Sequence, residues 1–549
     1  MTTAQNRFEE FTPKLASVIK EGYTAANLRA DAIAGLTVAI VALPLSMAIA
    51  IASGVSPDRG LTTAIIGGFL VSALGGSRFQ VGGPAGAFIV LVGATMALHG
   101  IDGLVLATFI SGIILAAAGY LRLGTYVKYI PYPVTVGFTA AIGAIILASQ
   151  LRDLFGLKLS VAEPGPLFEK LPVLWEALPT WNASALAIAV LTIAIIQGLR
   201  MARPGWPGML IAVVAASMAA ALLSLPIETI GSKFGGIPRT LPLPAMPDFS
   251  FDKVMAVLPA AFSFALLGAI ESLLSAVVAD GMSGRRHRSN AELAAQGFAN
   301  MGSALFGGFC VTGTIARTAT NVRAHAHGPV SGMLHSAFLL GFMLLAAPLA
   351  SYVPLACLAG VLALVAFNMV ERHAIAQISS ASLGDALVLF ATFAVTLTRD
   401  LMEGILTGFV IGAFLFIDRM GKSVLVEEND AAENAGFGKI GEDTVVYRIS
   451  GAFFFGAAAA VGTVLDRIAD RSANFVLDCS AVPLLDSTAA NVLEGAVRKA
   501  AKKGARVAIA GASMQARLML NAHGVKPPQV IFAVDVAEAI RQMHTERTP

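Results

Sequence analysis

The chain has few charged residues and few cysteines for its length. Asp, Glu, Lys and Arg make up 13% of its 549 residues, about half the share that is typical of soluble domains. The three cysteines, Cys310, Cys357 and Cys479, lack the spacing of a metal site or a disulfide framework. No GxxxxGK[ST] loop occurs, which argues against an ATP-driven motor. No cleavable signal peptide is evident, because Met1–Lys20 is polar and mixed in charge.

Long apolar runs take the place of the missing charge. Hydrophobic residues make up 56% of the chain, and the mean hydropathy is +0.74. Several runs approach the length of about 20 residues that spans a bilayer. We therefore predict a polytopic α-helical membrane protein, whose 54 glycines favour close helix packing. Its fourteen segments are expected near 28–53, 61–76, 84–98, 104–119, 131–149, 183–199, 208–225, 258–279, 291–307, 313–323, 328–346, 354–368, 383–399 and 401–418.

The distribution of basic residues predicts the orientation of these segments. Arg285, Arg286 and Arg288 share one loop, and alternate loops also carry Arg or Lys, whereas the links at 99–103 and 308–312 carry none. Basic loops face the cytoplasm. We expect a multi-pass protein of the cell (inner) membrane with the N- and C-termini cytoplasmic.

The membrane part repeats itself. The first segment carries Pro44, and about forty residues later comes the glycine-rich stretch 82–87. The eighth segment carries Glu271, and about forty residues later comes the stretch 311–314. Seven segments per half give the two halves opposite orientations. Short, Gly/Pro-interrupted segments at matching positions of an inverted repeat indicate a transporter site, so we predict two half-helices whose N-termini meet near mid-membrane.

The stretch Gly307–Asn321 is too short and too polar for an ordinary span. A helix that begins within the membrane offers free N–H groups and a partial positive charge, so the stretch is expected to bind an anion. Arg317 would add a full positive charge, because an intramembrane arginine usually faces a cavity or a partner. The alternative is that Arg317 neutralises an acidic neighbour and holds helices together.

Glu271 is the only carboxylate between Lys253 and Asp280. Burial disfavours the charged form of a carboxylate, so Glu271 could carry a proton during transport. Alternatively, it is a permanently ionised partner of Arg317. Leu45, Ile49 and Ala316 could add apolar walls to a site, although core packing is the better default explanation for any one of them.

The composition changes after Asp418. We predict four regions: an N-terminal segment (1–27), a transmembrane domain (28–419), a linker (420–442) and a C-terminal α/β domain (443–549). Within the last region, strands are expected at Thr444–Ser450, Asn474–Cys479, Arg506–Ala510 and Val530–Val534, and helices at Thr488–Lys503, Ser513–Ala522 and Ala537–His544.

Three motifs resemble one transporter family. They are Ala269–Leu274 with Val277–Gly281, then Asn290–Leu293 with Gln296, Gly297 and Asn300, and then Ala316–Arg323 with Pro329–Gly332. Together with the C-terminal domain they resemble the sulfate permease (SulP, solute carrier 26) family, whose members carry a STAS domain. The resemblance covers about residues 25–545 and is strongest to bacterial proton-coupled members. It implies a core and a gate domain, an elevator-like movement and a homodimer in the lipid bilayer.

The resemblance also assigns site residues by motif. It implies that Pro84, Ala85 and Gly86 line an anion site from the third segment, and that Leu45 and Ile49 face it from the first. It places Thr314, Ile315, Ala316 and Arg317 on the tenth segment's side. Glu271 matches the acidic position that is associated with cation coupling, and a glutamate there favours protons, whereas similar bicarbonate transporters have an aspartate and use sodium.

The expected function is secondary active uptake of sulfate or a small dicarboxylate, coupled to H⁺. The alternatives are a bicarbonate or other monovalent-anion transporter or exchanger, a passive anion channel, and a signalling protein. We expect no enzyme activity, no metal or other cofactor and no nucleic-acid partner. A cytoplasmic partner could bind the STAS domain, where Ser487 resembles a phosphorylated serine, although capping of a helix by Asp486 or Ser487 is the simpler explanation.

Overall fold

The computed structural model describes residues 10–126, 129–161, 164, 167–203, 206–399, 401–428, 444–470 and 474–545. The chain forms two compact units, Met1–Phe409 and Val410–Pro549, which are described in turn. Most of the predicted linker, from residue 429 on, lies outside the described residues. The predicted domain boundaries therefore stay predictions.

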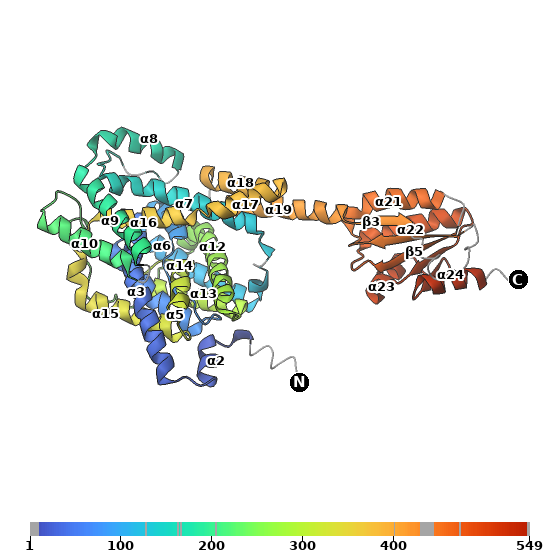
Figure 1. The fold of residues 1–549 in the computed structure, drawn as a ribbon, viewed down its shortest axis with the longest axis horizontal. Coiled ribbons are helices and arrows are strands. Elements are labelled where there is room, and N and C mark those ends of the chain that lie inside the picture. The colour runs from blue at the N-terminus through green and yellow to red at the C-terminus, as the bar shows by residue number, and fades with distance from the viewer. Residues whose placement is uncertain are drawn as a thin grey trace. The chain divides into compact units, whose positions relative to one another are not determined.

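The first unit is helical, as its composition predicts (Figure 1). Its first half begins with the short helix α2 (Lys14–Lys20), which occupies part of the segment that precedes the membrane. Eight helices of the described chain are long and apolar enough to span a bilayer, and shorter apolar helices lie between them. The helices up to residue 234 are α3 (Ala25–Ala52), α4 (Pro57–Thr62), η1 (Thr63–Gly67), α5 (Gly68–Leu74), η2 (Gly86–Phe88), α6 (Ile89–Tyr120), η3 (Leu123–Thr125), α7 (Tyr132–Phe155), α8 (Leu167–Ala177), η5 (Leu178–Thr180), α9 (Ala183–Ala202), α10 (Gly208–Leu222) and α11 (Ile230–Phe234).

The second half of the membrane part repeats this order of long, broken and short helices. The helices from residue 251 to residue 422 are α12 (Phe251–Ser283), α13 (Ser289–Leu305), α14 (Ile315–Arg323), α15 (Val330–Ala350), α16 (Leu355–Met369), α17 (Arg372–Ala381), α18 (Leu383–Thr398) and α19 (Leu401–Lys422). All fourteen predicted apolar segments coincide with helices, although two of them are joined. The third and fourth segments are two helices that meet at Gly100, where φ is +65° and ψ is −169°, and the label α6 covers both. The predicted link at 99–103 lies at this break, which occupies a single residue because glycine adopts a positive φ without steric cost.

Helix packing separates a core from a gate. Helix α6 packs against α12 and α13, and α3 packs against α15. A second group forms where α16 packs against α7 and α9, and α18 against α7. The first group contains the opening four segments of each half, and the second contains later segments of each half. This division agrees with the core and gate domains that the family resemblance implies.

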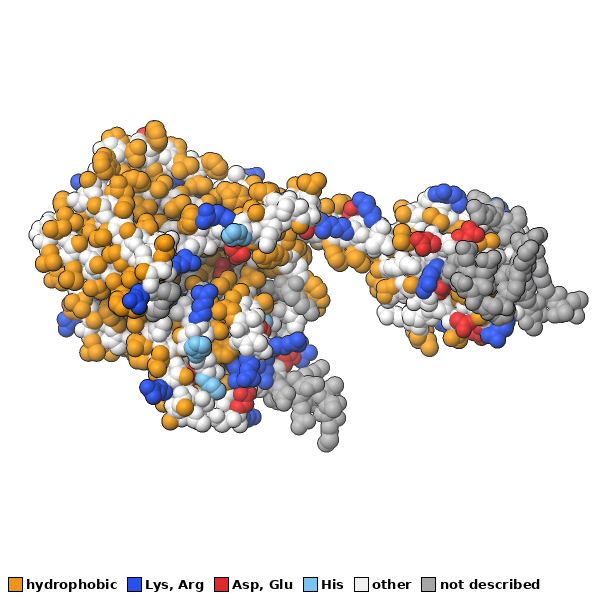
Figure 2. Space-filling model, in the orientation of Figure 1, with side chains coloured by type: hydrophobic (Ala, Val, Ile, Leu, Met, Phe, Trp, Pro, Cys, Tyr) orange, Lys and Arg blue, Asp and Glu red, His pale blue; other side chains and the backbone are white. Residues whose placement is uncertain are grey.

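The surface of the helical unit is largely apolar. Figure 2 shows hydrophobic side chains over most of its visible face. Phe262, Leu345 and Phe390 are among the large hydrophobic residues that remain exposed. An apolar belt of this kind is compatible with lipid, which solvates hydrocarbon side chains as well as a protein core does.

The C-terminal unit contains a five-stranded sheet in the order β3-β4-β5-β6-β7. Strands β4 (Thr444–Ser450), β5 (Asn474–Ala481), β6 (Val507–Ala510) and β7 (Val530–Ala533) are parallel and lie within two residues of the predicted strands. Strand β3 (Leu425–Glu428) is antiparallel to β4, and it lies within the segment that was predicted to be a linker. The sequence interpretation missed both β3 and the helix α21 (Phe455–Asp470).

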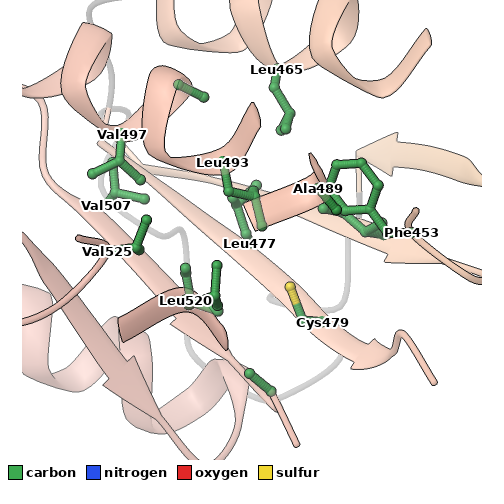
Figure 3. Close-up of a cluster of buried hydrophobic side chains, with 14 of the residues drawn as sticks. Phe453, Leu465, Leu477, Cys479, Ala489, Leu493, Val497, Val507, Leu520 and Val525 are labelled. Atoms are coloured by element: carbon green, nitrogen blue, oxygen red, sulfur yellow. The ribbon is translucent and has the colours of Figure 1, made fainter. Parts of the chain in front are cut away.

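Helices cover the sheet and close a buried core. Helix α22 (Ser487–Lys502) contributes Leu493 and Val497, and α23 (Met514–Ala522) contributes Leu520. These side chains meet Leu477 and Val507 of the strands, as Figure 3 shows. Residues of the fourth helix, α24 (Val536–Thr545), pack with other strand residues in a separate apolar cluster.

The N-terminal helix α2 is held against residues of the core. The backbone N–H of Lys14 donates to the Gly75 carbonyl at 2.9 Å, and Arg288 donates to the Thr12 carbonyl at 2.7 Å. Burial lowers the pKa of the Lys14 ammonium from its ordinary value of 10.5, and the positive charges of Arg288 and Arg78 lower it further. The folded protein therefore binds this proton more weakly than the unfolded chain does.

Replacing Lys14 with methionine should stabilise the protein at pH 7. The folded-state pKa is lowered, so the charged Lys14 destabilises the fold at low and neutral pH, and this effect disappears as the pH rises towards 10.5. Thermal unfolding of the purified protein should show a higher midpoint for Lys14→Met at pH 7 and a smaller difference at pH 10. Lys20→Met, an exposed change in the same helix, is the control. An equal gain at both pH values would contradict this account.

Candidate anion-binding site

Two short glycine-containing strands pair with each other within the core. Strand β1 (Gly82–Gly83) pairs antiparallel with β2 (Thr312–Gly313), with Gly82 opposite Gly313 and Gly83 opposite Thr312. Each strand leads into a helix of its own half, β1 into η2 and α6, and β2 into α14. The two stretches that the sequence paired as half-helix starts are thus in direct contact, although about 230 residues separate them.

The two helix starts leave their first amide groups free of side-chain caps. Ala85 precedes η2 and Thr314 precedes α14, and neither provides a capping hydrogen bond. Ala316, in the first turn of α14, is exposed, and Ile315 and Gly86 are half-buried. The N–H groups of a first helical turn have no intrahelical acceptor and carry partial positive charge. An anion that approached this point would meet unpaired donors from both halves of the protein.

The guanidinium group of Arg317 lies against the chain of β1, next to the point where β1 and β2 pair. Its side chain is 1% exposed, and its guanidinium donates to the Gly82 carbonyl at 3.3 Å, the Pro84 carbonyl at 3.3 Å and Ser46 Oγ at 3.0 Å. Among the described residues, no carboxylate oxygen lies within 4.0 Å of it, and Nε has no acceptor. The positive charge is therefore held by neutral oxygens and is not cancelled by a contacting acidic group.

Gly83 makes room for this guanidinium. A Cβ atom at position 83 would lie 1.7 Å from Arg317 Nη1, which is far too close for two atoms that are not bonded to each other. A side chain at Gly313 would likewise lie 1.8 Å from Gln80 Nε2. Glycine is thus required in both strands because polar side chains occupy the space beside them.

Glu271 lies in α12, which packs on β2 and α14. One turn earlier, the Gly268 carbonyl accepts a hydrogen bond from Thr312 Oγ1 at 3.2 Å. The Glu271 side chain is 8% exposed, and among the described residues it forms no hydrogen bond or ion pair. An ion pair between Glu271 and Arg317, the alternative that the sequence left open, is absent from the described part of the chain.

The remaining predicted site residues occupy the surrounding wall. Leu45 and Ile49 are buried in the same turn of α3 as Ser46, whose hydroxyl contacts Arg317. Pro84 contributes its carbonyl to the same guanidinium, and Ala85 is buried at the start of η2. The structure therefore brings residues of the first, third, eighth and tenth segments into one region of the core.

Gate residues that the sequence interpretation missed lie opposite this region. A Cβ at Gly86 would lie 3.3 Å from Ile146 Cδ1 in α7 and 3.9 Å from Met369 Sδ in α16. Both side chains come from the gate group, so the half-helix start faces the gate across a narrow apolar contact. No signal in the sequence marks these positions, because Ile146 and Met369 are apolar residues among many others in their helices.

A buried histidine is a second omission. His335 in α15 is fully buried, and among the described residues neither of its ring nitrogens has a hydrogen-bond partner. The positive charge of Arg317 acts on its ring. Its position in an apolar span was a usable signal, since polar residues within membrane segments are uncommon.

Other predicted chemistry is placed outside the membrane unit or is missing from the described residues. Asp486 caps α22 by accepting the Ala489 N–H at 2.8 Å, whereas Ser487 Oγ contacts Met519 Sδ at 3.5 Å. Capping thus falls to Asp486, and whether Ser487 is phosphorylated stays untested. No cluster of His, Cys, Asp and Glu that could hold a metal occurs among the described residues.

An inverted repeat of helices, with two broken helices that meet at an uncompensated arginine, defines a class of membrane transporter whose site suits an anion. The comparisons agree with this class. Residues 28–392 match the sulfate permease family, and residues 439–539 match the STAS domain. The chain belongs to the sulfate permease family and carries a C-terminal STAS domain.

Individual relatives cover nearly the whole chain. YvdB of Bacillus subtilis (strain 168), by its name a candidate sulfate transporter, is 37% identical over 508 residues, which cover 92% of this chain and 95% of that protein. The bicarbonate transporter BicA of Synechocystis sp. is 31% identical over 520 residues, with 90% of each chain covered. The murine Solute Carrier 26 family member A9 anion transporter, in an inward-facing state, has the same fold, with a TM-score of 0.85, 18% identity and coverage of 99% of this chain and 96% of that one.

Replacing Gly83 with alanine should destabilise the protein by about 1–3 kcal/mol, because overpacking at a filled position forces Arg317 out of its place. Thermal and denaturant unfolding of the purified variant measure this loss. Gly341→Ala in α15 is the control, since a Cβ there would meet nothing within 4 Å. Equal stability of the two variants would show that the guanidinium does not occupy the space beside Gly83.

Proposed function

We propose that this protein imports anions by secondary active transport coupled to protons, and that its substrate is sulfate or a small dicarboxylate. The supporting observation is that Arg317 is fully buried at the point where two helix starts meet, and that no carboxylate of the described residues contacts it. Burial of an unpaired charge is unfavourable unless the site regularly receives the opposite charge. Membership of the sulfate permease family supports an anion as that charge.

Glu271 is the proposed proton carrier. A carboxylate that is buried without donors favours its neutral form, and protonation would let the core cross the membrane without an extra negative charge. The site that the anion occupies comprises Pro84, Ala85, Gly86, Thr314, Ile315, Ala316 and Arg317, with Leu45 and Ile49 as apolar walls. Each of these assignments is part of the proposal.

An elevator-like movement of the core against the gate completes the proposal. The position of Gly86 beside Ile146 and Met369 supports it. Both gate side chains are apolar, so a movement of the core past them would break no hydrogen bond between these residues. We also propose that the protein acts as a homodimer in the inner membrane and that a cytoplasmic partner binds its STAS domain.

Bicarbonate is the second candidate substrate. The observation that favours it is the 31% identity to BicA, a bicarbonate transporter, over 90% of the chain. Purified protein in liposomes should be tested for uptake of labelled sulfate, succinate, fumarate and bicarbonate with an imposed pH gradient, with a sodium gradient and with neither. Uptake of no anion under any condition would refute the proposed function, and sodium-driven bicarbonate uptake would replace the proton-coupled assignment.

Replacing Glu271 with glutamine should abolish accumulation that is driven by a pH gradient, while exchange of internal for external anion persists. Glutamine imitates the protonated carboxyl group permanently, so the transport cycle no longer carries a proton. The two measurements are gradient-driven uptake and counterflow in the same liposomes. Asp252→Asn, an exposed change at the start of the same helix, is the matched control. Full gradient-driven uptake by Glu271→Gln would rule out this role.

Single-cysteine labelling tests the proposed orientation. Cys310, Cys357 and Cys479 are buried, so they should give little background. Thr240 follows the seventh predicted segment and therefore faces outward in this orientation, whereas Lys502 belongs to the cytoplasmic C-terminal domain. We expect a membrane-impermeant maleimide to label Thr240→Cys in intact cells and to label Lys502→Cys only after permeabilisation. Both positions are exposed. The opposite pattern would invert the topology.

A further inference from the structure

Helix α13 carries a row of buried polar residues that lie outside the proposed anion-binding site. Glu292, Gln296 and Asn300 recur every four residues, so they share one face of the helix. Their side chains are at most 2% exposed. Buried polar side chains of this kind require hydrogen-bond partners, and the partners reveal what the helix holds.

Glu292 receives donors from the chain that leads to β1. Its Oε2 accepts the Ser77 N–H at 3.0 Å, and its Oε1 accepts Gln80 Nε2 at 2.9 Å and Gln296 Nε2 at 3.0 Å. Ser272 Oγ lies 3.5 Å from the same oxygen and also accepts from Gln80 at 2.7 Å. Glu292 thus joins the approach to β1 with the residue next to Glu271.

Asn300 forms a matching pair of bonds with the chain that leads to β2. Its Oδ1 accepts the Val311 N–H at 3.0 Å, and its Nδ2 donates to the Val311 carbonyl at 2.8 Å. Val311 immediately precedes β2. The side chain of Gln80, which Glu292 orients, lies against Gly313 of β2, as the 1.8 Å distance to a Cβ placed there shows.

One helix therefore sets the spacing of both crossing strands. Glu292 and Asn300 are eight residues apart, which corresponds to about 12 Å along a helix at about 1.5 Å per residue. The helical backbone is stiff over this distance, so the two side chains act as fixed points for segments from opposite halves of the protein.

We propose that Glu292 is a positioning residue for anion binding: with Asn300, it holds β1 and β2 in the register that brings the two half-helix starts together. This inference rests on the proposed function, because the anion is what the two starts would bind. Glu292 and Glu271, both buried in the core, then have different tasks. Glu292 is surrounded by donors and serves as a fixed acceptor, whereas Glu271 makes no hydrogen bond among the described residues and is free to exchange a proton.

The decisive variant is Glu292→Gln. It preserves side-chain size but replaces one acceptor oxygen with an NH₂ group, which must face another donor, either Ser77 N–H or the amide groups of Gln80 and Gln296. With sulfate as the probe, or another anion of the panel that the parent carries, we expect the KM of uptake to rise about tenfold or more, with a smaller change in maximal rate. Glu292→Asp, which keeps both acceptor oxygens, should recover part of this loss.

Hydrogen exchange provides a readout that does not depend on transport. In Glu292→Gln, amides of residues 75–83 should exchange faster than in the parent, because either Ser77 or Gln80, both in the approach to β1, loses its acceptor. In Asn300→Ala, the faster exchange should be centred on Val311. Gln150→Leu in α7 is the control, since Gln150 is buried in the gate and its Nε2 has no partner among the described residues, and it should change neither KM nor exchange at 75–83.

The outcomes separate this inference from the proposed function. A parent protein that carries no anion refutes the proposed function, and exchange at 75–83 then decides alone whether Glu292 holds β1. If Glu292→Gln leaves both the KM and this exchange unchanged, the positioning role is wrong. A fall in maximal rate and thermal stability without a change in KM would also overturn it, because that pattern indicates a general structural role.

Discussion

The structure depends on burying one guanidinium group that no carboxylate contacts within the described part of the chain. Arg317 donates to two backbone carbonyls and one hydroxyl, and these acceptors come from β1, from the proline that follows it and from α3. Neutral acceptors solvate the charge but do not cancel it. This arrangement requires Gly83, because any larger residue would occupy the space of the guanidinium. The glycine strands, the proline and the arginine thus form one interdependent unit.

The second constraint is that the two halves must meet in a fixed register. Two residues of pairing between β1 and β2 provide too few hydrogen bonds to define a sheet. Side chains from α13 fix the register instead. Glu292 binds Ser77 in the chain that leads to β1, and Asn300 binds Val311 in the chain that leads to β2. A broken helix at membrane depth is tolerated when surrounding protein satisfies its polar groups, and α13 meets this requirement for both repeats.

Much of this organisation was predictable because it follows from pattern. The apolar segments, the inverted repeat and the pairing of 82–87 with 311–314 depend on hydropathy and on glycine and proline, whose effects are local. Strand β3 was missed, and the predicted link at 99–103 is a break at the single residue Gly100. A short exposed edge strand has no distinctive composition, and a one-residue interruption is indistinguishable in sequence from a short loop.

The sequence by itself determined that the protein is a membrane transporter of this family, that its two glycine-rich stretches correspond to each other, and that Glu271 is an isolated carboxylate within an apolar segment. Only the tertiary structure decided which groups contact Arg317, that Glu271 is not among them, and that Ile146 and Met369 face the site. The physical reason is distance along the chain. Hydropathy and helix starts are set by neighbouring residues, whereas these contacts join segments up to about 280 residues apart, and only folding brings them together.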